Sequence, residues 1–525
     1  MAGLLCAVAP MNTACAQSDP TATVQADAAM RDIQREIAIA GILDRLMPDE
    51  RAFFTVIRNA RIVDPVNEAV SNPQSVVIRG SEIRWVGPQS EEPELDDPLI
   101  IDGRDQYLSP GLIDMHIHSE SASSWLLNLA NGVTSVREMD GFPWMLATRR
   151  QINAGRMLGP NLYVTGPIFN QYPLGGYAVI PADSIEARAM VRRQAACGYD
   201  FIKVHNVLSP QLLTAVGDEA RRSGLHLVGH VPHFVAVRDA VEAGLRTQEH
   251  LKGFLDDRTL TMGDTDYASA SLPDVWITPT LYTGQAYLPV EQMRAALANE
   301  ETRYVPPEVL DQWRAVLAEP EDRLLELRRD SQRLRRQIVA SLVTHEARFL
   351  AGTDASNYPF QIMGFALIEE MRLLQNAGVP IGGTLRAATT APADAMGASG
   401  EFGRIAQGAR ADLVLLDNNP FTDPQAYGSN QGVMVRGIWL TSDALDTALN
   451  ELAALYAGTG VDQNANQDVI METVEELMEN GFVFPQPVID RTAAAFRHTE
   501  ANELSRRLQI RAGRPLQGPC AEIMQ

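Results

Sequence analysis

Residues 111–118 read Gly-Leu-Ile-Asp-Met-His-Ile-His and follow a Ser-Pro break that is typical of a turn. Side chains alternate between the two faces of a strand, so Asp114, His116 and His118 share one face and apolar side chains take the other. Two imidazoles that point the same way at the carboxyl end of a buried strand are candidate ligands for a metal ion. A pair of structural histidines is the alternative interpretation, because a His-x-His pair alone is only moderately specific.

Lysine is nearly absent from the chain. The 44 basic residues include only two lysines, Lys203 and Lys252, and the others are arginine. Arginine keeps its proton in proteins, whereas a buried lysine can become a neutral, reactive amine. Lys203 lies in the apolar, strand-like stretch 199–205, where a lysine is costly unless it is paired or modified. We therefore predict a chemical role for Lys203, while Lys252 fits an incidental lysine that extends its amine toward solvent.

Composition narrows the classes of protein and partner. A chain of 525 residues is long enough for one large domain with additions, or for two to three domains. Its net charge of −22 argues against nucleic acid and against an anionic membrane as partners. Beyond the N-terminal segment, no stretch has the ~20 consecutive apolar residues that cross a bilayer. We expect a small-molecule or dipeptide-like substrate, and homo-oligomerisation stays open.

The first 16 residues resemble a cleavable export signal. They are mostly small and apolar and end in Ala-Cys-Ala before Gln17. A lipid-modified Cys15 is the alternative, although the residues before it fit that poorly. We therefore expect a periplasmic or secreted protein. Cleavage would leave Cys197 and Cys520, and an oxidising compartment would permit a bridge that the sequence does not establish.

The rest of the chain divides into regions of different periodicity. Residues 17–53 form an N-terminal arm, and residues 54–109 contain short strands broken by Gly, Pro and Asp. Residues 110–396 alternate short apolar strands with helix-like stretches, which predicts an α/β fold, a (β/α)8 or TIM barrel. Residues 397–445 return to strand and turn, and we expect them to complete a small β-sandwich with 54–109. Residues 446–525 predict a helical C-terminal extension.

The predicted barrel strands are 112–118, 133–138, 162–166, 199–204, 225–230, 245–250, 275–281 and 348–354. We also expect a helix over 383–396, a strand over 433–440 and a solvent-facing helix around the basic run 333–336.

Candidate metal ligands occupy the same end of five of these strands. They are His116 and His118 on the first strand, Lys203 on the fourth, His230 on the fifth, His250 on the sixth and Asp354 on the eighth. Active sites of TIM barrels are built at the carboxyl ends of the strands. A single buried His or Asp is usually structural, but six such residues at corresponding ends argue against chance.

These motifs resemble the amidohydrolase superfamily, in particular its imidazolonepropionase-like and prolidase-like branch. The motifs that carry the resemblance are 110–118 (Pro-Gly-Leu-Ile-Asp-Met-His-Ile-His), 132–138, 201–204, 229–232, 249–250, 278–281, 352–355 (Gly-Thr-Asp-Ala) and 408–414. The resemblance extends from about residue 54 to about residue 440. It implies a TIM barrel beside a small domain made from the flanking β segments. Arg410 stands where the family commonly has lysine, and the N-terminal arm and the C-terminal extension lie outside the resemblance.

The resemblance implies a centre of two divalent metal ions. His116, His118 and Asp354 would bind one ion, His230 and His250 would bind the other, and Lys203, carboxylated to N6-carboxylysine, would bridge them. Two divalent ions carry four positive charges, which a carbamate, Asp354 and a hydroxide would reduce to about one, whereas an ammonium at Lys203 would repel the metals. Zinc is the expected metal, with manganese or iron as alternatives. Asp354 would be the catalytic residue that carries the proton from the attacking hydroxide to the departing nitrogen.

The bridging lysine favours hydrolysis of a linear amide. Imidazolonepropionase-type enzymes lack it, whereas dipeptidase-type members and those that hydrolyse N-acyl amino acids have it. We therefore expect a dipeptide or an N-acyl amino acid as substrate. A cyclic-amide hydrolase or a deaminase is the alternative, and a binding protein without catalysis is a third.

A dipeptide-like substrate needs partners for its carboxylate. Candidates are Arg137, His205, His233, Tyr172 and Tyr177. The alternatives are that Arg137 pairs with a carboxylate inside the barrel, and that the two histidines only orient the metal ligands.

Overall fold

The computed structural model describes residues 20–119, 121–174, 178–256, 261–283, 290–318, 322–355, 360–423, 425–458, 467–480, 482–485 and 488–489. The predicted export signal, Tyr177 and Cys520 lie outside the described residues. Cys197 is disulfide-bonded, and its partner also lies outside them. None of the described helices is both long enough and apolar enough to span a bilayer.

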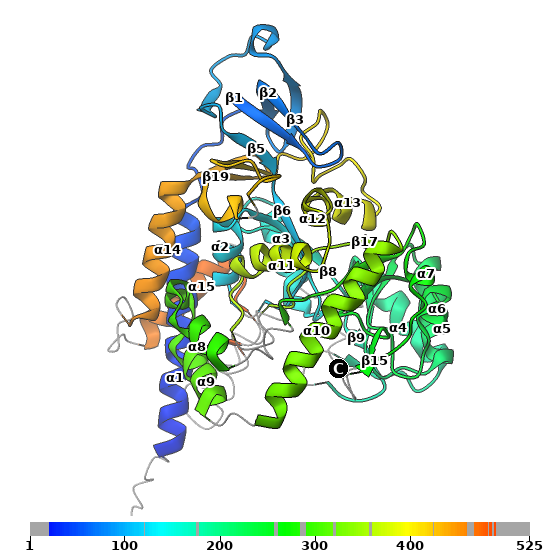
Figure 1. Cartoon of the computed structure of the whole chain (residues 1–525). Helices are drawn as coiled ribbons and strands as arrows, with labels where there is room; N and C mark the ends of the chain where they lie inside the picture. Colours follow the sequence, from blue (N-terminus) through cyan, green and yellow to red (C-terminus); the bar gives the residue numbers. More distant parts are fainter. Residues whose placement is uncertain are drawn as a thin grey trace, which may run out of the picture.

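The β segments before and after the central region form one sheet, at the top of Figure 1. Its strands are β1 (Phe54–Asp64), β2 (Ala69–Arg79), β3 (Glu82–Gly87), β4 (Leu99–Asp102), β5 (Tyr107–Pro110), β18 (Leu413–Leu416), β19 (Asn430–Val435) and β20 (Ile438–Thr441). The order is β20-β19-β18-β5-β1-β2-β3, and β4 pairs with β1. The antiparallel pairing of β5 with β18 joins segments about 300 residues apart.

One strand of this sheet differs from its prediction. The predicted strand 433–440 is a hairpin, in which β19 and β20 pair antiparallel around Arg436 and Gly437. Both of these residues have positive φ, 48° and 77°. A two-residue type I′ turn requires this backbone conformation, and the continuous apolar pattern concealed the turn.

The central region consists of parallel strands, and all eight predicted strands are present. They are β6 (Leu112–Ile117), β7 (Val133–Glu138), β8 (Asn161–Val164), β11 (Phe201–Val204), β12 (His226–Gly229), β13 (Leu245–Glu249), β16 (Trp276–Thr278) and β17 (Arg348–Phe349). They divide into two sheets, β6-β7-β8 and β10-β9-β11-β12-β13-β16-β17, the latter including β9 (Ile168–Phe169) and β10 (Ala178–Val179). Two parallel bridges connect these sheets: Thr165, after β8, pairs with Phe201 of β11, and Ile117 of β6 pairs with Ala355, which follows β17.

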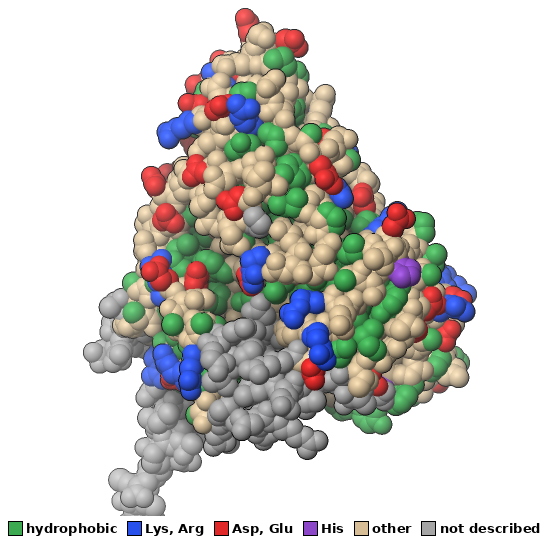
Figure 2. Space-filling view, in the orientation of Figure 1, with side chains coloured by type: hydrophobic (Ala, Val, Ile, Leu, Met, Phe, Trp, Pro, Cys, Tyr) green, Lys and Arg blue, Asp and Glu red, His purple; other side chains and the backbone are tan. Residues whose placement is uncertain are grey.

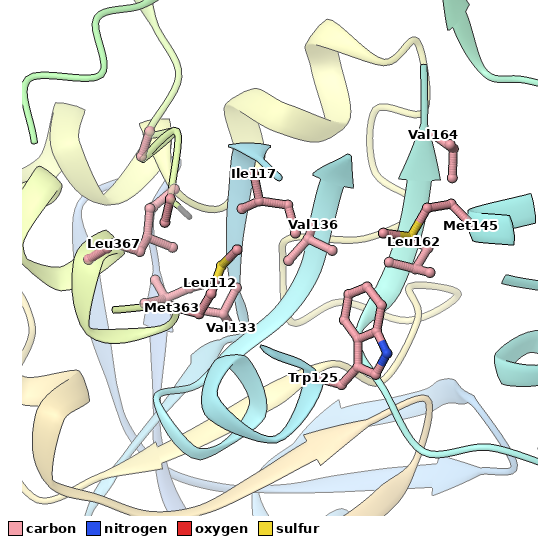
Figure 3. Close-up of a cluster of buried hydrophobic side chains, with 14 of the residues drawn as sticks. Leu112, Ile117, Trp125, Val133, Val136, Met145, Leu162, Val164, Met363 and Leu367 are labelled. Carbon is pink, nitrogen blue, oxygen red and sulfur yellow. The ribbon is translucent and has the colours of Figure 1, made fainter. Parts of the chain in front are cut away.

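Helices cover the parallel strands, as βαβ connections require. They are α2 (Ser123–Ala130), α3 (Pro143–Asn153), α4 (Ser184–Cys197), α5 (Pro210–Arg222), α6 (Val237–Glu242), α7 (Tyr267–Ala270), α10 (Asp322–Thr344) and α11 (Phe365–Asn376). Figure 3 shows part of the core between them, where Ile117 and Val136 of the strands face Met363 and Leu367, and Trp125 packs near Leu162.

Two helix predictions need correction. The predicted helix 383–396 is two short helices, α12 (Ile381–Ala387) and α13 (Thr390–Ala395). Pro392 is tolerated only in a first helical turn, so the chain restarts there. On α10, Arg333 and Arg336 are exposed as expected, but Arg335 is only 7% exposed and is part of the interior.

Three further groups of helices complete the molecule. Helix α1 (Pro20–Arg45) of the N-terminal arm lies beside α14 (Ser442–Tyr456) and α15 (Gln467–Glu479) of the C-terminal extension (Figure 1). A long connection between β16 and β17 contains α8 (Val290–Ala298), the 3-10 helix η3 (Glu300–Tyr304) and α9 (Pro307–Ala318).

On the face in Figure 2, acidic and basic side chains are interspersed, and no broad basic patch is visible there.

Candidate metal centre

Four histidines converge at the carboxyl ends of β6, β12 and β13. The ring centroids of His116 and His118 are 5.1 Å apart, and those of His116 and His250 are 4.6 Å apart. The ring of His230 lies 4.8 Å from that of His250. All four side chains are buried. Residues separated by more than 130 positions in the sequence therefore share one polar cluster, as the strand-end argument predicted.

Asp354 meets the histidine pair of β6 at the spacing of metal ligands. Its Oδ1 lies 2.9 Å from His118 Nε2 and 3.4 Å from His116 Nε2, and the two Nε2 atoms are 3.2 Å apart. Ligand bonds of about 2.0–2.1 Å at tetrahedral angles place neighbouring ligand atoms about 3.3 Å apart. The three atoms therefore fit a single small cation. His250 Nδ1 is 3.7 Å from the other oxygen, Oδ2, of Asp354.

Each of the four histidines contacts an oxygen through Nδ1. The partners are Glu249 Oε2 for His116 (2.9 Å), Asp140 Oδ1 for His118 (2.6 Å), Asn206 Oδ1 for His230 (2.7 Å) and Thr280 Oγ1 for His250 (2.7 Å). An Nδ1–H that donates to a neighbouring oxygen leaves the lone pair on Nε2 and fixes the ring. Metal-ligating histidines typically have such a partner, so the donor set fits divalent metal ions.

Lys203 lies at the end of β11 and is 2% exposed. Burial is the largest influence on its amine and lowers the pKa, while the carboxylates of Asp140, Asp354 and Glu249 act in the opposite direction. A lowered pKa increases the fraction of neutral amine, which is the form that reacts with carbon dioxide.

The pKa values of His116 and His118 are shifted in opposite directions. Burial lowers the pKa of His116 to about 4, so that this ring is neutral at physiological pH. Burial also acts to lower the pKa of His118, but the carboxylates of Asp140 and Asp354 outweigh it and raise that pKa to about 10. Burial acts to raise the pKa of Asp354, yet the facing histidines hold it well below its usual range. A metal ion would therefore displace a proton from His118 on binding.

Backbone strain accumulates at this cluster. His250 and Asp354 have φ of 62° and 58°, and Thr280 has φ of 47°. Residues other than glycine adopt this left-handed conformation at a cost of about 1–2 kcal/mol each, and such strain concentrates at functional sites. Gly352 is needed for space, because a Cβ there would stand 3.0 Å from His116 Cβ and 2.5 Å from Thr278 Cγ2.

Arg137 pairs with Glu249, which in turn contacts His116. This favours pairing with a carboxylate inside the protein over substrate binding. The fully buried guanidinium donates from Nη2 to Glu249 Oε1 at 2.8 Å and from Nη1 to Thr247 Oγ1 at 3.1 Å. Its Nε donates to the carbonyl oxygen of Met115 at 2.7 Å. Each of the three guanidinium nitrogens of Arg137 thus donates to a group of the protein itself, which favours a structural role over binding of a substrate carboxylate.

The other candidate substrate ligands lie at varied distances from the cluster. The ring of His205 is 4.1 Å from that of His230, and burial lowers the pKa of His205 to about 3. His233 is half-buried, and its backbone N–H donates to the carbonyl of Asn206. Tyr172 is 65% exposed, and no contact of its side chain with the cluster is present among the described residues.

Sequence reasoning missed the residues that orient the histidines. Glu249 and Asp140 stand beside recognised motifs, but which ring each one faces depends on strand register. Asn206 and Thr280 follow β11 and β16, where polar side chains after strands were the available signal. Arg335 was also missed: its Nη1 donates to the carbonyl of His250 at 3.3 Å.

Comparisons with known proteins show the family of the chain. The model of the Amidohydrolase family matches residues 107–442. Ochratoxinase from Aspergillus niger is 26% identical over 195 residues, which cover 28% of this chain and 40% of the relative. The chain spans less than half the length of the curated relatives it matches.

Solved structures share the fold. A bottromycin amidohydrolase superimposes with a TM-score of 0.67 at 24% identity, covering 82% of this chain and 95% of that one. A protein from Bifidobacterium longum, provisionally called a prolidase, superimposes with a TM-score of 0.60 at 23% identity, covering 77% and 100%. The family match spans well over half of the chain, which therefore belongs to the amidohydrolase family.

Proposed function

We propose that this protein is a metal-dependent amidohydrolase that cleaves a linear amide, in a dipeptide or an N-acyl amino acid. The observation that carries the proposal is the triangle of His116, His118 and Asp354, whose edges of 2.9–3.4 Å suit one small cation. His230 and His250 lie beside it and provide ligands for a second ion. Zinc suits this mixture of imidazole and carboxylate, and manganese or iron are the alternatives.

Lys203 is proposed as the bridge between the two ions. Its neutral amine adds to the carbon of carbon dioxide and releases a proton, which yields the carbamate of N6-carboxylysine. Burial favours the neutral amine that this step requires. The carbamate then adds a negative charge among ligands that are otherwise mostly neutral imidazoles, which favours binding of divalent cations.

Asp354 is proposed as the proton carrier. A divalent pair, when bound, supplies Lewis acidity and a water that ionises near neutral pH. The facing histidines lower the pKa of Asp354, so its carboxylate is ionised and able to accept a proton. Its Oδ2 is 3.4 Å from Thr283 Oγ1. The carboxylate takes a proton from the water as it attacks the amide carbon and delivers it to the departing nitrogen, so no charged amide anion has to leave.

The substrate class rests on the bridging lysine and on the names of the relatives. The names of a bottromycin amidohydrolase and a provisional prolidase are consistent with hydrolysis of an amide. A relative named adenine deaminase, 31% identical over 87 residues, supports a deaminase as the alternative, and a cyclic-amide hydrolase is the other alternative. His205 and His233 are retained as candidates for the substrate carboxylate. A panel of dipeptides, N-acyl amino acids, lactams and amino-heterocycles separates these reactions.

The fold and the location of the protein are part of the same proposal. We infer that the two parallel sheets are the two halves of one (β/α)8 barrel over 110–396, because the bridges Thr165–Phe201 and Ile117–Ala355 connect β8 with β11 and β6 with the segment after β17. The flanking segments 54–109 and 397–445 would form its small β domain. Export of the chain, directed by residues 1–16, completes the proposal.

The decisive experiment replaces each lysine in turn. We expect Lys203→Ala to abolish amide hydrolysis and to lower the metal content from two ions toward one per chain. Lys252→Ala is the matched control, since it removes the only other lysine, and it should keep both ions and measurable activity. Elemental analysis and hydrolysis assays on the same zinc- or manganese-loaded samples decide the outcome. Unchanged activity and metal content in Lys203→Ala would falsify the bridging role.

A further inference from the structure

A cavity of about 490 Å3 lies beside the loop that follows the histidine pair of β6. Four separate parts of the chain enclose it: α1 of the N-terminal arm, residues 121–127 of the β6–α2 loop and α2, the segment from Tyr304 to Trp313, and residues 361–363. Helix α1 lies outside the segment 107–442 that matches the family model. One wall of the cavity is therefore built from a part of the chain that lies outside the family match.

The cavity adjoins the candidate metal centre through Gln361. This residue lines the cavity, and its Nε2 is 3.5 Å from Thr283 Oγ1 and 3.4 Å from the carbonyl oxygen of Thr353. Thr283 Oγ1 is in turn 3.4 Å from Asp354 Oδ2. Gln361 on the cavity wall is thus connected to the Asp354 carboxylate by two successive contacts through Thr283. Together these contacts span about the length of two residues of an extended chain.

One side-chain atom of Gln361 has no partner in the part of the chain that the structure describes. The side chain is 6% exposed, and its Oε1 has no hydrogen-bond partner among the described residues. A buried, unsatisfied amide oxygen costs about 1–3 kcal/mol, so it is better explained by a donor that arrives from outside. The N–H of an amide substrate is such a donor.

Helix α1 holds the wall of the cavity in place. Glu36, 4% exposed, accepts hydrogen bonds from Ser121 Oγ at 2.6 Å and from the backbone N–H of Ala122 at 3.2 Å. Tyr456 of α14 donates to Ser123 Oγ at 3.0 Å from the other side. The cavity is thus largely formed before any ligand arrives, as small-molecule sites usually are.

The lining suits an uncharged, apolar group. Leu127, Val309, Trp313 and Met363 contribute apolar surface. Arg35, which also lines the cavity, is already paired with Glu308 at 2.6 Å and lies 3.8 Å from Asp32. The ion pairs compensate the charge, so an aromatic ring or a branched aliphatic chain gains more from this cavity than a carboxylate does.

We propose that this cavity binds a bulky apolar group, aromatic or branched aliphatic, of the amide substrate, and that Gln361 Oε1 accepts an N–H from the same substrate. The inference rests on the proposed amide hydrolysis and assigns a preference for one kind of amide substrate to it. The enzyme then favours amides with a large apolar group over amides with a methyl group at the same position.

The test fills the cavity from its rim. Gln312 of α9 is exposed and lines the cavity, so Gln312→Trp introduces a large ring with little cost to the core. Val316→Trp, on the same helix at a position that is 39% exposed and does not line the cavity, is the matched control. Each enzyme is assayed on pairs of N-acyl amino acids and dipeptides that differ only by a methyl or an aromatic group, on either side of the scissile bond.

We expect Gln312→Trp to lower kcat/KM for the aromatic member of at least one pair by about tenfold or more, with the methyl member and the control within about twofold of the wild type. Equal losses on both members, no loss on either, or a wild type that prefers the methyl member overturns the cavity proposal while amide hydrolysis stands. A metal-loaded wild type that cleaves none of these amides overturns the proposed function and the cavity proposal together.

Gln361→Leu gives a second, independent measurement. It keeps the volume of the side chain and removes the acceptor, so KM for the preferred amide should rise about tenfold, while the metal content stays at the wild-type value. An unchanged KM refutes the role of the Gln361 oxygen, and a loss of metal assigns the residue to the metal centre instead.

Discussion

At the scale of single residues, the site depends on a buried relay from Arg137 through Glu249 to His116. The pair Arg137–Glu249 is fully buried, with 2.8 Å between Nη2 and Oε1, and Glu249 Oε2 then contacts His116 Nδ1. Burial acts to raise the pKa of Glu249, but Arg137 and His116 hold it well below its usual range. The ionised carboxylate orients the imidazole, so Arg137 acts on the metal centre without touching it.

We predict that Arg137→Met is strongly destabilising and impairs metal binding. Removal of one partner of a buried ion pair costs about 3–5 kcal/mol, and loss of the group behind a metal-ligating histidine lowers metal affinity about 10–100-fold. Thermal unfolding and metal titration measure the two effects. Arg246→Met, on the same strand as Glu249 but half-buried, is the control, and equal metal affinity in both variants would contradict the relay.

A second residue-scale prediction concerns Glu370 on α11. Its carboxylate accepts from the backbone N–H of Tyr282, and burial raises its pKa to about 8. The unfolded chain releases this proton near pH 4.5, whereas the folded chain keeps it to about pH 8. The unfolded state therefore binds fewer protons across this window, and the contribution of Glu370 to stability falls as the pH rises.

Glu370→Gln cannot ionise, so its stability relative to the wild type should increase from pH 5 to pH 8, by an amount on the order of a few kcal/mol. Denaturant unfolding at several pH values checks the slope. Glu369→Gln, which alters a carboxylate paired with Arg372 at the helix surface, should give no such trend. A flat difference between Glu370→Gln and the wild type across the window would refute the assignment.

The sequence predicted the candidate ligands better than the groups that hold them. His116 and His118 are recognisable because they stand at the end of β6, and Asp354 because it lies in the short Gly-Thr-Asp-Ala motif five residues after β17. Their partners are fixed by contacts across the fold: Asp140 faces His118 because β7 pairs with β6, and that pairing contains register shifts that alternation alone does not reveal. For the same reason, the sequence left open whether Arg137 binds a substrate or pairs with a carboxylate inside the barrel.

At the scale of elements, α1 replaces a cap that α2 lacks. The first residue before α2 is Ala122, which has no side chain to cap the helix. Glu36 of α1 accepts the Ala122 N–H instead, as the glutamate of a capping box does within one helix. The loop that connects His118 to α2 is therefore fixed by a helix from outside the family-matching region.

We predict that Glu36→Ala destabilises this loop by about 1 kcal/mol, the usual value of a helix cap. Hydrogen exchange of residues 121–127 should accelerate by about the corresponding factor of five to ten. Glu36→Gln keeps one acceptor oxygen and should show a smaller effect. If exchange in this segment matches the wild type in Glu36→Ala, helix α1 does not support the loop.

Prediction of elements succeeded for strands and failed where a local break interrupts a continuous pattern. The eight parallel strands were found because short stretches, most of them apolar, alternate regularly with helix-like connections. The hairpin at Arg436–Gly437 was read as one strand, and the helix pair around Pro392 was read as one helix. In both cases the backbone, through positive φ or a missing N–H, outweighs the periodicity of the side chains.

At the scale of the whole molecule, Asp412 joins the eight-stranded sheet to the parallel strands. It precedes β18, is 4% exposed, and accepts from Asn161 Nδ2 at the start of β8 at 3.0 Å. It also accepts from the backbone N–H of Arg436 at 2.8 Å and pairs with Arg410, which donates onward to Ser135 Oγ of β7 at 3.1 Å. The Ala-Arg-Ala-Asp-Leu motif at 409–413 thus has a structural purpose, since its charged residues connect two separate cores. The sequence alone did not reveal this connection, because its partners lie about 250 residues away.

We therefore predict that the two cores unfold together in the wild type and separately in Asp412→Ala. The substitution leaves Arg410 without its buried carboxylate partner, which costs about 3–5 kcal/mol at the junction, while each core keeps its own apolar contacts. Scanning calorimetry should show one transition for the wild type and two for the variant. Asp417→Ala, at the exposed end of the same strand, is the control and should keep a single transition. A single transition in Asp412→Ala, shifted only to lower temperature, would contradict this prediction. The pairing of β5 with β18, together with the direct connection from β5 to β6, would then be enough to couple the two cores.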